Sequence, residues 1–255
     1  MNNFFKSKLL DHYGIQGKFF TRNGGFSTGR FSSLNFAGKF DDINIPKNKE
    51  VVAKSFGVQS AKIKFLNQVH GNDVIVIDST NANSDLSATK ADAIVTKIPG
   101  VVLAVLTADC CPILFSDPVS KIIGCAHSGW RSAFSGVIES TVDAMLALGA
   151  DKKSIVAAIG PSISWDSYEV DAAFKMQFLE QSISNQEFFK PSSNDGHYFF
   201  NLKAYAKNRA TQKGIEQMED LEIDTYSQPE HFFSCRRAYH KGEHGFGNQL
   251  SGICL

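Results

Sequence analysis

Two apolar runs between residues 101 and 130 constrain the fold of this chain more than any other stretch. Val101–Leu106 and Ile122–Ala126 are continuously apolar, as expected of strands buried on both faces of a sheet. Each run is shortly followed by a side chain that can bind a metal or act as a nucleophile. These side chains are Cys110, next to Asp109, and His127, just before a predicted helix. The stretch therefore predicts an α/β fold with its chemistry at the ends of strands.

Strand-like and helix-like segments alternate along the rest of the chain. Helices are predicted over Asn48–Phe56, Ser132–Leu148, Val170–Ser182 and Leu202–Lys213, and strands over Ile63–Leu66, Val74–Asp78, Ala91–Thr96, Ile155–Ile159 and Met218–Ile223. The Ser132–Leu148 helix is the best defined, because apolar residues recur along one face and Gly149 can end it. The tail from Phe232 onward is predicted to be loop-rich. This alternation favours one α/β domain over residues 1–255, with sheets covered by helices.

Composition narrows the class of partner. Lys+Arg and Asp+Glu number 26 each, so the formal net charge is zero and no broad positive field exists to attract nucleic acid or an anionic membrane. We therefore expect small-molecule partners. Five cysteines, an odd number, do not form a disulfide framework, and Cys111 and Cys125 are expected in the core. Neither a secretory signal nor a run of about 20 apolar residues is visible, so the expected location is the cytoplasm.

Three residues suggest a metal site. His70, which lies in the punctuated segment Asn67–Asn72, joins Cys110 and His127 as ligands that suit zinc. Two His and one Cys leave a fourth coordination position open, as in catalytic rather than structural zinc sites. The same residues allow a metal-free alternative, in which Cys110 is a nucleophile, a histidine is its base and Asp109 orients that base. Their spacing alone leaves both alternatives open, as well as ordinary packing roles.

Several arginines are candidates for binding an anion. Arg131 lies at the start of the predicted long helix, where the helix N-terminus also favours negative charge. The Gly24–Gly29 loop, followed by Arg30, has the glycines of an anion-binding loop but also suits an ordinary hairpin. Arg236 and Arg237 form a further pair, suited to phosphate, carboxylate or structural carbonyl groups. The zinc-deaminase signature and H-E-x-x-H are both absent.

A series of motifs resembles the laccase-domain (YfiH-like) family. The motifs are Gly24-Gly25-Phe26-Ser27-Thr28-Gly29 with Ser33-Leu34-Asn35, Asn67-Gln68-Val69-His70-Gly71, Thr107-Ala108-Asp109-Cys110, Ala126-His127-Ser128-Gly129-Trp130-Arg131, Gly160-Pro161-Ser162-Ile163, Tyr168-Glu169-Val170, and Phe232-Phe233-Ser234 with Arg236-Arg237. They follow the family's order and span nearly the whole chain. The resemblance implies an α/β fold with mixed β-sheets, related to bacterial toxin deamidases.

The resemblance also implies an activity. Family members, formerly labelled multicopper polyphenol oxidases, are zinc-dependent purine nucleoside phosphorylases that also deaminate adenosine and cleave methylthioadenosine. By resemblance, His70, Cys110 and His127 bind the catalytic Zn²⁺, and the substrates are adenosine, inosine, guanosine and methylthioadenosine with phosphate. Copper is disfavoured, because seven singly scattered histidines do not form the clusters of a multicopper enzyme. A metal-free Cys–His amidase or deamidase and a non-catalytic zinc- or nucleoside-binding module remain the alternatives.

Phosphorolysis requires an anion site beside the metal. We expect Arg131 to bind phosphate, with Arg30 and Ser27 of the glycine-rich loop as a second wall. Asp109 is expected to orient a metal ligand, transfer a proton or cap its strand. Two positions depart from the family pattern: Arg30 stands where many members have Pro, and Asp224 where many have Cys. The second departure leaves the role of position 224 open.

Overall fold

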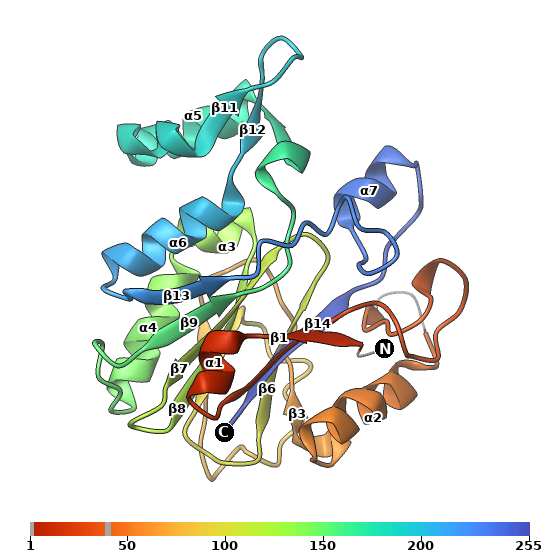
Figure 1. The fold of residues 1–255 in the computed structure, drawn as a ribbon, viewed down its shortest axis with the longest axis vertical. Helices are drawn as coiled ribbons and strands as arrows, with labels where there is room; N and C mark the ends of the chain where they lie inside the picture. Colours follow the sequence, from red (N-terminus) through yellow and green to blue (C-terminus); the bar gives the residue numbers. More distant parts are fainter. Residues whose placement is uncertain (1–2, 39–41) are drawn as a thin grey trace.

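Two β-sheets pack face to face in the computed structural model, which describes residues 3–38 and 42–255. Helices cover the outer faces, so the layers run helix, six-stranded sheet, five-stranded sheet, helix (Figure 1). Strand residues alternate between these layers: Leu103 and Val105 pack between the sheets, whereas Val102 and Ala104 face the outer helix. Both sheets are therefore buried on both faces, which explains the continuous apolar runs.

The two large sheets are mixed, as the family resemblance implies, whereas the small third sheet is antiparallel. The six-stranded sheet has the order β13-β9-β7-β8-β5-β4, the five-stranded sheet β1-β2-β14-β6-β3, and a small sheet β10-β12-β11. Their bounds are β1 Phe4–Lys6, β2 Gln16–Phe20, β3 Ile63–Lys64, β4 Val74–Ile77, β5 Ala93–Thr96, β6 Val102–Thr107, β7 Cys111–Asp117, β8 Ile122–Ser128, β9 Val156–Ile159, β10 Glu169–Asp171, β11 Phe189–Pro191, β12 His197–Phe200, β13 Gln217–Asp220 and β14 Gln249–Cys254. Parallel pairs (β4 with β5, β9 with β13) stand beside the antiparallel β7–β8 hairpin.

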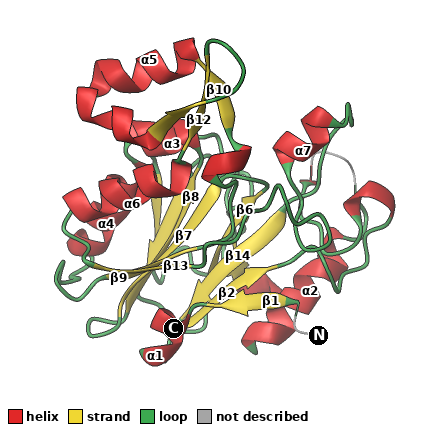
Figure 2. Cartoon of the chain, turned by 45° about the horizontal axis from the view of Figure 1, so that its top comes forward, coloured by secondary structure: helices red, strands yellow, loops and turns green. Residues whose placement is uncertain are grey.

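Helices α3, α4 and α6 cover the six-stranded sheet, and α2 covers the five-stranded sheet. The helices are α1 Lys8–His12, α2 Ile45–Phe56, α3 Trp130–Ser135, α4 Val137–Ala147, α5 Ala172–Gln181, α6 Leu202–Gln212 and α7 Cys235–His240, with 3-10 helices at Gly29–Phe31, Ser60–Lys62, Trp165–Ser167 and Ile183–Phe188. Both views place the small sheet and α7 at the same end of the molecule (Figure 1, Figure 2). Among the described residues, no helix has the length and apolar character that a membrane span requires.

Three predicted elements need correction. The single helix over Ser132–Leu148 is two helices, because Gly136 adopts φ 95°, a left-handed conformation that ends α3 before α4 begins. The helix predicted from Val170 begins later, because residues 169–171 pair with β12 and the Asp171 side chain caps α5. The loop-rich tail contains α7 and β14, and β14 pairs with both β2 and β6. Cys111 and Cys125 are fully buried, as predicted.

Candidate metal centre and active-site cleft

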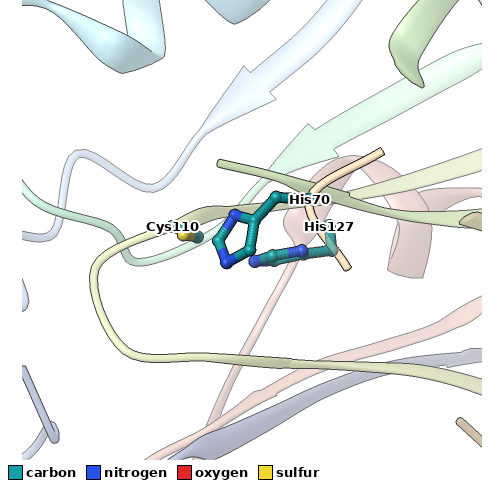
Figure 3. Close-up of side chains that lie close together, drawn as sticks. All are labelled: His70, Cys110 and His127. Carbon is teal, nitrogen blue, oxygen red and sulfur yellow. The ribbon is translucent and has the colours of Figure 1, made fainter. Parts of the chain in front are cut away.

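His70, Cys110 and His127 converge at one end of the six-stranded sheet. Their ligand atoms all lie within 4.8 Å of one another (Figure 3). In the β7–β8 hairpin Pro112 is opposite His127, so Cys110, just before β7, reaches the same edge. His70 comes from the loop between β3 and β4 and has a strained backbone with φ 60°. The structure thus brings together the three side chains that the sequence predicts, and they form the one such metal-capable group within the described ranges.

A carboxylate that the sequence motifs do not predict, Asp92, binds the His127 ring and the backbone of the loop that carries His70. Asp92 Oδ1 lies 2.7 Å from His127 Nδ1, which directs Nε2 away from the carboxylate. The backbone N–H groups of Val69, His70 and Gly71 donate to the same carboxylate over 3.1, 2.9 and 2.7 Å. Burial acts to raise the pKa of Asp92, but these hydrogen bonds and the His127 ring lower it overall. The sequence does contain one indication of this role: Asp92 lies at the start of an apolar strand, and a buried carboxylate needs hydrogen-bond partners.

Gly129 leaves space for two members of this cluster, His70 and Cys110. A Cβ at this position would lie 2.8 Å from His70 Nδ1 and 2.9 Å from Cys110 Sγ, closer than non-bonded atoms approach. Two imidazole nitrogens and one sulfur are the donor set of a catalytic zinc site, with bond lengths of about 2.1 and 2.3 Å. His127 also has the hydrogen-bonded carboxylate, Asp92, that usually orients a metal-binding histidine. The residues present therefore fit a bound metal ion.

Asp109 ties distant segments to the strand end that carries Cys110. Its buried carboxylate accepts hydrogen bonds from Thr225 Oγ1 (2.7 Å), Ser234 Oγ (2.9 Å) and the backbone N–H of Arg236 (2.7 Å). Burial raises the pKa of Asp109 despite these bonds. Burial also raises the pKa of the Cys110 thiol, and the neighbouring Asp109 adds to the shift. A metal cation would offset both effects on the thiol.

A cleft of about 720 Å³ opens beside the metal ligands. It is lined by His70, Ala108, Asp109, Cys110, Trp130, Arg131, Ile163, Tyr168, Glu169, Val170, Asp171, Phe174, His197, Leu202, Cys235, Arg236, Tyr239 and His240. The small sheet, α7 and the segment after β8 all contribute to it. Its volume is typical of small-molecule sites, and its aromatic walls suit a flat ring.

The structure separates the predicted phosphate residues. Arg131 lines the cleft and is exposed, although it lies in a helix of six residues rather than at the start of a long one. Arg30 and Ser27 are not among the described residues that line the cleft. Ser27 is buried and its hydroxyl accepts a hydrogen bond from Asn48 Nδ2 of α2 (2.8 Å). The expectation of a second phosphate wall from this loop therefore has no support in its placement, because the loop packs against α2.

Asp224 and Arg237 have structural partners. The Asp224 carboxylate accepts hydrogen bonds from the backbone N–H groups of Ser164 and Tyr226, each at 3.0 Å, so it joins two loops beside the cleft. Arg237 Nη1 donates to the carbonyl oxygens of Thr225 (2.7 Å) and Tyr226 (2.8 Å), the carbonyl cluster that was one of its predicted roles. An aspartate can thus serve as a loop clamp at position 224.

Fold and site define a layered α/β protein with a His–Cys–His cluster of the metal-binding type. Residues 16–255 match the family described as multi-copper polyphenol oxidoreductase laccase, and the chain belongs to this family. A purine nucleoside phosphorylase of Rickettsia conorii is 36% identical over 227 residues, 88% of this chain and 91% of that protein. The solved structure of Neisseria meningitidis protein NMB0706 has a TM-score of 0.87 at 29% identity, covering 100% of this chain and 99% of that one. Bacillus licheniformis hypothetical protein YfiH gives 0.89 at 27% identity, covering 100% and 97%. The predicted family and fold class are confirmed.

Proposed function

We propose that this chain is a zinc-dependent purine nucleoside phosphorylase. It splits adenosine, inosine, guanosine and methylthioadenosine with phosphate, and also deaminates adenosine. The observation that carries the proposal is that His70 and Cys110, which form a metal-capable cluster with His127, line a cleft that also contains Arg131. The name of the Rickettsia conorii relative, matched over most of both chains, supports the reaction class. A cytoplasmic location is part of the proposal and rests on the free cysteines.

His70, Cys110 and His127 would hold the zinc ion. When bound there, zinc would polarise a substrate atom or lower the pKa of a bound water. Asp92 fixes the orientation of the His127 ring, and Gly129 keeps the space between the ligands open. A multicopper oxidase needs further His-rich ligand groups, and the part of the chain described here contains one metal-capable group. We therefore propose zinc rather than copper.

The chain's other residues would bind and orient the substrates. Arg131 is proposed to bind phosphate, because a guanidinium can donate two parallel hydrogen bonds to two phosphate oxygens. Trp130, Tyr168 and Phe174 give the cleft aromatic walls against which a purine can pack. Asp109 would fix the position of the adjacent Cys110 relative to Arg236, because the Asp109 carboxylate accepts a hydrogen bond from the Arg236 backbone N–H.

Chromatography of adenosine incubated with the zinc-loaded protein tests the proposal. Adenine and ribose 1-phosphate should form only when phosphate is present, and inosine should form with or without it. His70→Ala, Cys110→Ala and His127→Ala should each abolish both products while thermal unfolding remains cooperative. Full turnover by metal-depleted protein would overturn the zinc assignment.

Two other outcomes would select the alternatives. Alkylation of Cys110 by an electrophilic amide substrate analogue, with no zinc found by elemental analysis, would indicate a metal-free amidase or deamidase. Saturable nucleoside binding without any product would indicate a non-catalytic binding module.

A further inference from the structure

Two arginines share the cleft without a carboxylate partner. Arg131 and Arg236 both line it, and neither forms an ion pair with any residue that the structure describes. The Arg131 guanidinium stacks over the Trp130 ring, 4.4 Å from its centroid. The one hydrogen bond of the Arg236 guanidinium to a described residue runs from Nη1 to the backbone oxygen of Glu169 (2.6 Å), which is not a charged group. Two like charges facing one cleft favour a bound anion.

Tyr168 adds an unused hydrogen-bond donor to the same cleft. Its ring centroid lies 5.1 Å from the Arg236 guanidinium carbon, and its hydroxyl makes no hydrogen bond to the described residues. Arg131, Arg236 and Cys110 line the same cleft as Tyr168. Burial raises the pKa of Tyr168, and the hydroxyl therefore keeps the proton it can donate.

The acidic residues of the cleft are already occupied by other partners. The Asp109 carboxylate accepts the backbone N–H of Arg236 as well as two hydroxyls. Glu169 accepts a hydrogen bond from Asn194 Nδ2 (2.9 Å), and Asp171 accepts the backbone N–H of Phe174 (2.7 Å) as the cap of α5. The negative charges are thus bound to protein donors, whereas the two guanidiniums still have free donors.

We propose that Arg131 and Arg236 hold free phosphate between them, with the Tyr168 hydroxyl as a third donor. The identity of the anion rests on the proposed function. In that reaction an oxygen of hydrogen phosphate bonds to the ribose C1′ as the bond from C1′ to the purine nitrogen breaks. The electron pair of the broken bond remains on the purine, which takes the proton of hydrogen phosphate, and ribose 1-phosphate is the other product. Arg236 takes the place that the sequence analysis gave to Arg30 and Ser27.

Calorimetric titration of the full-length, zinc-loaded protein with inorganic phosphate tests the clamp. Arg236→Gln should weaken phosphate binding at least about tenfold, because a charge-assisted hydrogen-bond donor is lost. Arg236→Lys should recover part of the loss, since it keeps the charge without the two-pronged geometry. Tyr168→Phe should weaken binding about three- to tenfold. Lys241→Gln, which removes an exposed charge next to α7 but outside the cleft, is the matched control and should change nothing.

Unchanged phosphate binding by Arg236→Gln, with zinc content and unfolding temperature as in the wild type, would overturn the clamp. If Arg236-dependent binding were seen with adenosine 5′-monophosphate but not with inorganic phosphate, the clamp would bind phosphate esters and the proposal would also be wrong. Kinetics separate this proposal from the activity. Phosphate-dependent nucleoside cleavage with an unaltered KM for phosphate in Arg236→Gln would leave the activity standing without the clamp. Arg236-dependent phosphate binding without cleavage would leave the clamp standing without the activity.

Discussion

Gly129→Ala is expected to remove the metal site without unfolding the protein. Gly129 has φ −71° and ψ 171°, which alanine adopts without strain. The added methyl carbon would nevertheless lie 2.8 Å from His70 Nδ1 and 2.9 Å from Cys110 Sγ. Contact between non-bonded heavy atoms begins at about 3.5 Å, so each group must move by roughly 0.6–0.7 Å. Metal–ligand distances tolerate only about 0.2 Å.

The displacement predicts a large loss of metal affinity and a small change in stability. Because changes in the groups that merely support metal ligands cost about 10–100-fold, displacement of the ligands themselves should cost at least about 100-fold in zinc affinity. Alanine at a helix N-cap loses about 0.5–1 kcal/mol, and the lower chain entropy of unfolded alanine returns about as much. Competition with a chromophoric chelator measures the affinity, and urea unfolding in chelator measures the stability.

Gly71→Ala is the matched control. Gly71 lies next to His70, but a Cβ there would meet Asp92 Oδ2 at 3.6 Å and Val69 Cγ2 at 3.7 Å, which are ordinary contacts. This variant should bind zinc within about threefold of the wild type. Wild-type affinity in Gly129→Ala would refute the reasoning, because His70 and Cys110 could not then both bind the metal from their positions against Gly129.

Three further changes test separate parts of the structure. Asp92→Asn should lower zinc affinity about 10–100-fold in the same competition assay, because the group that orients His127 loses its charge; unchanged affinity would remove Asp92 from the site. Arg30→Gln should leave the KM for phosphate within about twofold, and a tenfold rise would return the glycine-rich loop to the phosphate site. Burial acts to raise the pKa of Asp224, but its hydrogen bonds lower the pKa overall. The Asp224 carboxylate therefore stabilises the fold above the ordinary pKa of 3.8, and this contribution is lost as the pH falls through the lower pKa of the folded state. Asp224→Ala should therefore destabilise by about 1–2 kcal/mol at pH 7 and by less at pH ~3 in urea unfolding, and an equal loss at both would contradict this account.

The three members of the metal-capable cluster could be predicted from strand ends and sequence motifs. Val101–Leu106 and Ile122–Ala126 correspond closely to β6 and β8, and strand ends in α/β sheets gather side chains from distant segments. His70 was identifiable through its motif rather than its spacing. The resemblance over nearly the whole chain joins the three residues into one predicted site from the sequence alone.

The rest depends on contacts between distant segments, which spacing does not show. Asp92 looks like one polar residue in an apolar strand until its hydrogen bonds to the 69–71 loop are seen. Arg236 lies at the cleft because its backbone N–H donates a hydrogen bond to Asp109, which is far from it in the sequence. The break at Gly136 lies inside an uninterrupted amphipathic pattern, and only its left-handed φ shows that the axis changes there. Each case is one in which tertiary contacts outweigh local preference.

The position of β14 has a consequence for how the chain is made. This strand, Gln249–Cys254, pairs on one side with β2 and on the other with β6, so it closes the middle of the five-stranded sheet. Until residue 254 has been synthesised and released, β2 and β6 each expose an unpaired edge that can pair with another chain. Nascent or prematurely ended chains should therefore be held by chaperones or aggregate, even though His70, Cys110 and His127 are already present in them.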